Sequence, residues 1–116
     1  MKNKIYCFDI DNVICRTYKS DYKNSKPLKK NIKFINNLYS RGFYIKIFTS
    51  RFMGRNNENI IKATKQGYQF TLKQLKKWGV NYNEIIFGKP SYDIFVDDKA
   101  YGFKKNWTKN LKILIK

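Results

Sequence analysis

The chain has 116 residues, of which 42% are hydrophobic and 17% aromatic, a composition typical of one globular domain rather than a disordered segment. It contains no histidine, which excludes Ser-His-Asp and Cys-His catalysis and histidine-based zinc sites. The formal charge is +17, and Lys outnumbers Arg by 21 to 4. Two explanations of this charge stay open: a field that attracts anionic partners, or a codon bias without function.

No apolar run of the sequence approaches the length of a membrane span, and the first residues lack the apolar core and cleavage site of a signal peptide. We therefore expect a cytoplasmic protein that does not contact a membrane. The two cysteines, Cys7 and Cys15, are expected to be reduced and to act as small hydrophobic side chains.

The first half of the chain predicts a strand, a helix and a second strand. The apolar run from Ile5 to Ile10 is short and continuous, as in a strand buried on both faces. Pro27 is expected to open a helix that Gly42 ends. Residues 43–48 predict the second strand. The apolar positions that recur at helical spacing are Leu28, Ile32, Ile35 and Leu38.

The second half begins with a polar stretch and continues with helical character over residues 57–65 and 68–78, which Gly79 ends. Short strands are predicted at 85–87 and 94–96, each followed by a polar group.

The tail, residues 111–115, is predicted as a last strand. Strands that alternate with helices indicate one α/β domain over residues 1–116 with a mostly parallel sheet.

Polar side chains follow each predicted strand at the point where it ends. The carboxyl ends of parallel strands meet at one edge of the sheet, where the ligand crevice of an open α/β sheet lies. Four of the eight acidic residues are therefore expected to converge there with hydroxyl and basic groups. The groups are Asp9 and Asp11, then Thr49-Ser50-Arg51, then Gly88-Lys89-Pro90, and finally Asp97-Asp98.

The spacing of these acids predicts a cation site. Asp9 and Asp11 are two residues apart, so on an extended backbone their side chains point the same way. Two close carboxylates repel each other unless a cation lies between them, and an all-oxygen site suits magnesium. Asp97 is expected to be a direct ligand, and Asp98 to act through water because neighbouring strand residues face opposite sides.

The segments FDIDNV, IKIFTSR, FGKP and FVDDKA, in this order, resemble the four motifs of the haloacid dehalogenase-like (HAD-like) phosphatase superfamily. The stretches TSRFMGRNN and IIFGKPSYDIFVDDKA resemble its small capsule- or polysaccharide-biosynthesis phosphatases. The resemblance covers about residues 4 to 102. It implies a Rossmann-like three-layer sandwich, and the intervals between motifs leave no room for a cap domain.

The resemblance implies a role for each motif residue. Asp9 would be the nucleophile that forms an aspartyl-phosphate, and Asp11 would protonate the leaving alcohol and then activate water. Thr49 would donate a hydrogen bond to the phosphoryl group, and Lys89 would balance its charge. Asp9, the backbone carbonyl of Asp11, and Asp97 would hold magnesium.

Some assignments keep an alternative. Asn12 stands where the family commonly has Gly, and Asn tolerates the left-handed backbone that such a turn needs. Ser50 could serve in place of Thr49. Arg51 and Arg55 are expected either to bind a second anionic group of the substrate or to be solvated surface charges.

Lys89 could instead be a solvated lysine without a catalytic role. Asp97 and Asp98 could instead be a turn or a helix-capping pair.

The expected function is that of a magnesium-dependent phosphomonoester hydrolase acting on a small phosphorylated metabolite. A sugar phosphate of capsule or surface-polysaccharide synthesis is the substrate that the resemblance implies. A site without a cap accepts large substrates or uses a neighbouring subunit as a lid, so a homo-oligomer is one possible partner. The alternatives are a nucleic-acid 3'-end phosphatase, for which nucleic acid would be the partner, and a non-catalytic phosphoacceptor or binding module.

Overall fold

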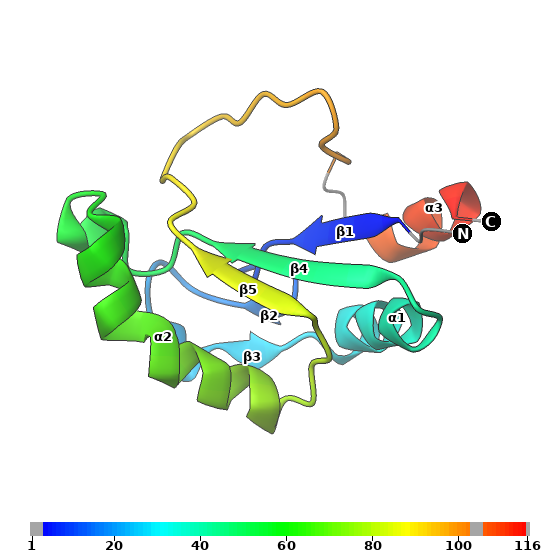
Figure 1. Ribbon diagram of the computed structural model, residues 1–116, viewed down its shortest axis with the longest axis horizontal. Helices are drawn as coiled ribbons and strands as arrows, with labels where there is room; N and C mark the ends of the chain where they lie inside the picture. The colour runs from blue at the N-terminus through cyan, green and yellow to red at the C-terminus, as the bar shows by residue number, and fades with distance from the viewer. Residues whose placement is uncertain (1–3, 103–105, 116) are drawn as a thin grey trace.

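The computed structural model describes residues 4–102 and 106–115. Its centre is a sheet of three parallel strands in the order β1-β4-β5 (Figure 1). The strands are β1 (Ile5–Phe8), β4 (Tyr44–Thr49) and β5 (Glu84–Phe87). The prediction of an α/β fold with a parallel sheet is therefore confirmed.

The register of the strands places their carboxyl ends close together. Phe8, the last residue of β1, pairs with Ile47, and Phe87, the last residue of β5, pairs with Thr49 at the end of β4. The three strands therefore end within two residues of one another. The residues that follow them, Asp9 and Gly88 among them, lie at the same edge of the sheet.

Three helices accompany the sheet: α1 (Lys29–Ser40), α2 (Ile60–Lys77) and α3 (Trp107–Leu114). Pro27 does not open α1 but lies in a short strand just before it. None of the helices in the described part of the chain is long and apolar enough to span a membrane. The minor elements are β2 (Cys15–Arg16), which is antiparallel to β3 (Lys26–Pro27), and the 3-10 turns η1 (Tyr22–Asn24) and η2 (Gly54–Asn56).

The main core lies on one face of the sheet. Ile45 and Ile47 of β4 are fully buried there against apolar side chains of α1 and α2, which lie on the same side of the sheet in Figure 1. On β1, by contrast, Ile5 is 51% exposed and Cys7 is also exposed. The expectation that this strand is buried on both faces is wrong, because Ile5 and Cys7 share a face of the strand that stays exposed.

Two predicted strands are absent from the described chain. Residues 94–96 lie in an irregular segment, where Ile94 and Val96 are 83% and 90% exposed. Residues 111–114 belong to α3 instead of a strand. Its residue Trp107 packs on Phe8, with ring centroids 5.8 Å apart. A short apolar run is compatible with a helix as well as a strand, and here the contact between Trp107 and Phe8 favours the helix.

The two helical stretches predicted over residues 57–78 form the single helix α2. Its buried positions recur every four residues, which places one stripe of the helix against the rest of the molecule. The buried residues of this stripe are Ala63, Gly67, Thr71 and Leu75.

Gly67 gives the ring of Phe52 room to pack on α2. A Cβ atom at Gly67 would overlap the carbons of that ring. The ring has little freedom to move away, because Tyr22 packs on it at 4.9 Å and the Arg55 guanidinium lies over it at 4.8 Å.

We expect Gly67→Ala to lower the free energy of unfolding by about 1 kcal/mol or more, measured by urea denaturation. Alanine in a helix interior normally gains about 1 kcal/mol over glycine, but overpacking a core costs about 1–3 kcal/mol. Gly54→Ala is the matched control, because the nearest atom to its added Cβ is Ser91 Oγ at 3.8 Å. An equal or greater stability of Gly67→Ala would show that Phe52 can move aside.

Candidate active site

Asp9 and Lys89 form an ion pair at the carboxyl edge of the sheet. Lys89 Nζ lies 3.0 Å from Asp9 Oδ2, and the backbone N–H of Ile10 donates to Asp9 Oδ1 at 2.7 Å. The backbone N–H of Lys89 donates to the carbonyl of Thr49 at 3.1 Å, which ties the residue to the end of β4. Gly88, with φ of 101°, supplies the turn between β5 and Lys89. The sheet therefore holds one carboxylate against one ammonium group.

The surroundings of this ion pair shift the pKa of Asp9 and the pKa of Lys89. Burial raises the pKa of Asp9 above its ordinary value, and the hydrogen bond from Lys89 only partly offsets this effect. Burial alone would lower the pKa of Lys89, but hydrogen bonds with Tyr92 and Asp9 outweigh it and raise that pKa. The Lys89 ammonium also lies 5.4 Å from the centre of the Tyr92 ring. Lys89 is therefore a protonated cation at neutral pH.

Asp11 is bound to a different cation, Arg51. The guanidinium of Arg51 is fully buried and donates from Nε to Asp11 Oδ2 at 3.0 Å and from Nη2 to Oδ1 at 2.9 Å. The hydroxyl of Thr17 donates to the same Oδ1 at 2.6 Å. Two charged donors and one neutral donor thus hold the Asp11 carboxylate in one orientation.

The rest of the Arg51 side chain is also satisfied. Nη1 donates to Gln74 Oε1 at 2.6 Å, and Gln74 in turn donates to the carbonyl of Tyr22 at 2.7 Å. The ring of Tyr22 lies 4.8 Å from the Arg51 guanidinium carbon. Gln74, Tyr22 and Thr17 come from three separate segments that no motif links, so the sequence alone did not predict their place beside Arg51 and Asp11.

The turn between Asp9 and Asp11 separates their partners. The strand β1 ends at Phe8 and the chain bends at Ile10, so these two acids are not on an extended backbone. Asn12 follows with φ of 66°, the left-handed conformation expected for this position. The expectation of an extended backbone between the two acids is therefore wrong, and in this structure each carboxylate has its own basic partner.

The predicted phosphate-binding residues after β4 have different surroundings. Thr49 is fully buried, and its Oγ1 accepts a hydrogen bond from the backbone N–H of Arg51 at 3.0 Å, which leaves its hydroxyl proton for another acceptor. Ser50 is partly exposed beside it. Arg55 is exposed and donates to the carbonyl of Ser20 at 2.9 Å.

Arg51 is thus not a surface charge. Its buried guanidinium is directed at Asp11, within the protein.

Asp97 and Asp98 do not join the other acids. Both are exposed in the segment between β5 and α3, which arches away from the sheet in Figure 1. Asp97 Oδ1 accepts a hydrogen bond from the backbone N–H of Lys99 at 3.0 Å, and this bond lowers the pKa of Asp97. Among the residues that the structure describes, no group of three or more acidic or cysteine side chains could hold a metal ion.

The chain matches no protein-family model and no curated protein. It is similar to the crystal structure of an MCSG target from Vibrio cholerae, with a TM-score of 0.78 and 26% sequence identity. The match covers 97% of this chain and 99% of the other. This likeness supports the α/β fold over nearly the whole length of both chains.

Proposed function

We propose that this protein is a phosphomonoester hydrolase of the HAD-like superfamily that works through an aspartyl-phosphate intermediate. The observation that carries the proposal is the ion pair between Asp9 and Lys89 at the carboxyl ends of β1 and β5. Phosphoryl transfer needs a nucleophile held beside groups that neutralise the charge of the incoming phosphate. Asp9 supplies the first requirement and Lys89 the second.

In this proposal Asp9 attacks the phosphorus atom of the substrate, and the bond to the leaving alcohol oxygen breaks. Lys89 turns its ammonium toward the transferred phosphoryl group, and the hydroxyl of Thr49 donates to a phosphoryl oxygen. Asp11 gives a proton to the leaving oxygen, which departs as the alcohol. It later takes a proton from the water that attacks the aspartyl-phosphate, and this second step releases inorganic phosphate and restores the Asp9 carboxylate. The bonds from Arg51 and Thr17 fix the direction of that carboxylate, with Arg51 Nη2 at 2.9 Å from Oδ1.

Magnesium fits the donor chemistry of the site but only part of its geometry. Asp9 and the backbone carbonyl of Asp11 offer hard oxygen ligands at one strand end, whereas Asp97 lies exposed in the segment above the sheet. Bound magnesium would neutralise phosphate charge next to the attacking carboxylate. We expect Asp97 to become a ligand only when residues 94–96 pack against the open edge of β1.

The proposed substrate is a small sugar phosphate, in keeping with the resemblance to polysaccharide-biosynthesis phosphatases, and the proposed location is the cytoplasm. Between β4 and β5 the chain has only η2 and α2, so a cap is not inserted there. Ser50, which is partly exposed, and Arg55, which is exposed, are proposed to contact the rest of the substrate. Arg51 is already paired with Asp11 and is therefore not proposed to contact the substrate.

The test is phosphate release by the purified full chain from sugar phosphates, nucleotides and 3'-phosphorylated oligonucleotides, with magnesium and with EDTA. We expect release only with magnesium, fastest from a sugar phosphate. A 3'-phosphorylated oligonucleotide as the best substrate would favour the nucleic-acid end phosphatase instead. No release from any of these substrates would overturn the proposal.

A further inference from the structure

One face of the parallel sheet is not covered by the rest of the described chain. Successive residues of a strand point to opposite faces. On one face the apolar strand residues belong to the clusters of the core; they are Tyr6, Phe8, Ile45, Ile47, Ile85 and Phe87. On the other face, which Ile5 and Cys7 share, the strand residues stay outside these clusters and are partly or largely exposed. The remaining residues of this uncovered face are Tyr44, Lys46, Phe48, Glu84 and Ile86.

A parallel sheet normally has both of its faces covered. Here the helices α1 and α2 lie on one side of the sheet (Figure 1), and their buried side chains join the core clusters together with Trp107 of α3. The segment between β5 and α3 does not cover the other side, because Ile94 and Val96 are 83% and 90% exposed. The uncovered face is therefore a surface that a partner would complete.

The uncovered face carries balanced charge on a strongly basic chain. It has one cation, Lys46, and one anion, Glu84, which pair in register on neighbouring strands. The formal charge of the whole chain is +17, so two copies repel each other over most of their surface. This repulsion is smallest where the charges of a surface cancel. The uncovered face is therefore better suited to a second copy than a lysine-rich surface is.

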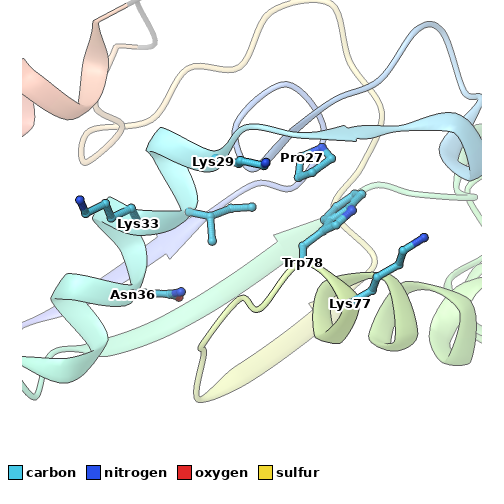
Figure 2. A pocket seen from close by; sticks show the side chains of 7 residues that line it. Pro27, Lys29, Lys33, Asn36, Lys77 and Trp78 are labelled. Carbon is cyan, nitrogen blue, oxygen red and sulfur yellow. The ribbon is translucent and has the colours of Figure 1, made fainter.

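A hollow between α1 and the end of α2 does not suit a second copy in this way (Figure 2). Lys33 and Lys77 extend from its rim in different directions in Figure 2, and Lys29 stands beside them. As far as the structure describes its lining, the hollow has no acidic side chain. Two copies that met at this hollow would bring like charges together.

The order of the residues on the uncovered face is self-complementary. Lys46 lies beside Glu84 on the next strand, and Phe48 lies beside Ile86. A two-fold axis that runs along the strands between β4 and β5 places Lys46 of each copy opposite Glu84 of the other copy. The same axis places Phe48 of each copy opposite Ile86 of the other. Symmetric dimers are built from such reciprocal contacts, in which each residue meets the other's partner.

The contacts within one chain leave Lys46 and Glu84 able to take part in this exchange. Lys46 Nζ lies 3.8 Å from Glu84 Oε1, which is longer than a charge-assisted hydrogen bond, and the two side chains are 34% and 40% exposed. The hydroxyl of Tyr44 donates to the same Oε1 at 3.2 Å. A carboxylate accepts about four hydrogen bonds, so Glu84 has capacity for a lysine of the second copy.

We propose that the uncovered face binds a second copy of this chain, sheet against sheet, around this two-fold axis. The apolar side chains bury surface on association, and the exchange between Lys46 and Glu84 sets the register of the two sheets. Phe48 directly precedes Thr49, and Ile86 lies three residues before Lys89. The second copy therefore borders the edge of the sheet that carries the candidate active site.

A charge exchange between two variants tests this proposal. Lys46→Glu places acids opposite each other in a symmetric dimer, and Glu84→Lys places lysines opposite each other. Each variant alone should dimerise about tenfold more weakly than the unmodified chain, or weaker still. An equal mixture of the two restores both attractive contacts, so the mixed dimer should form within about threefold of the unmodified affinity.

The measurement is sedimentation equilibrium of the full chain at concentrations up to about 300 µM, which detects a weak dimer. The unmodified chain is expected to approach twice the 14.0 kDa mass of one copy. The matched control is Lys73→Glu, which makes the same change of charge at an exposed position of α2, on the other side of the sheet. It should change the dimer affinity less than about twofold, and mixing it with Glu84→Lys should restore nothing.

Circular dichroism would check that each variant folds. Recovery on mixing separates association from folding, because a defect within one chain is not repaired by adding another chain. Four results would overturn the proposal: an unmodified chain that stays monomeric, full dimerisation of Lys46→Glu, no recovery on mixing, and equal weakening by Lys73→Glu. A monomer would mean that residues 94–96 or a different protein cover this face. The readout is mass, so the result does not depend on the proposed hydrolase activity.

Discussion

Asp9→Asn is expected to reduce magnesium-dependent phosphate release by roughly 10³-fold or more, the scale seen when a catalytic nucleophile is removed. An amide nitrogen or oxygen does not replace a carboxylate as the attacking group, so the aspartyl-phosphate cannot form. The measurement is initial rate on the best substrate of the panel, at several substrate concentrations. We expect the loss in the turnover number rather than in KM.

The matched control for this experiment is Asp21→Asn, which removes the same charge from an exposed turn where Asp21 is bonded only locally, to Asn24 at 2.9 Å. Its rate should stay within about twofold of the unmodified protein. Substantial phosphate release by Asp9→Asn would mean that Asp9 is not the nucleophile. The ion pair with Lys89 would then be structural.

Arg51→Met is expected to lower the free energy of unfolding by about 3 kcal/mol, measured by urea denaturation. The substitution keeps much of the buried volume but leaves the Asp11 carboxylate, only 21% exposed, without its charged partner. It also removes the partner of Gln74 Oε1, which accepts from Arg51 at 2.6 Å. Breaking a buried ion pair from one side costs more than the pair itself contributes.

A double variant separates the unpaired charge from lost packing. In Asp11→Asn with Arg51→Met no charge is left buried, so the double variant should lose less stability than the sum of the two single variants. Arg41→Met is the control for losing an arginine, because Arg41 is exposed at the end of α1 and should cost less than about 1 kcal/mol. Additive losses would show that Arg51 and Asp11 are energetically independent.

Local pattern was sufficient where a segment's own periodicity decided its structure. The parallel strands β1, β4 and β5 and the helix α1 follow from short apolar runs and from apolar positions at helical spacing. The rule that strand ends share an edge also anticipated that Asp9 and Lys89 would meet, although 80 residues separate them. These inferences need only the pleat of a strand, the turn of a helix and the direction of parallel strands.

Local pattern failed where a segment's partner decided its structure. Residues 94–96 are apolar enough for a strand, but they form none because no neighbouring strand pairs with them in this arrangement. The tail was predicted as a strand, but a short apolar run is compatible with a helix as well. Residues 111–114 belong to α3, whose residue Trp107 packs on Phe8. A short apolar run does not specify whether it will pair with a strand or pack against the core as a helix.

The sequence by itself determined an α/β chain with a parallel sheet, and it predicted that Asp9 and Lys89 meet at one edge of that sheet, whereas Asp97 and Asp98, which were also expected there, lie away from it. Only the tertiary structure decided how those charges pair. Arg51 reads as a loop cation, yet it is buried because the fold brings Asp11, Gln74 and Tyr22 around it from distant segments. Periodicity is a property of neighbours along the chain, whereas the pairing of a buried charge depends on every segment that surrounds it.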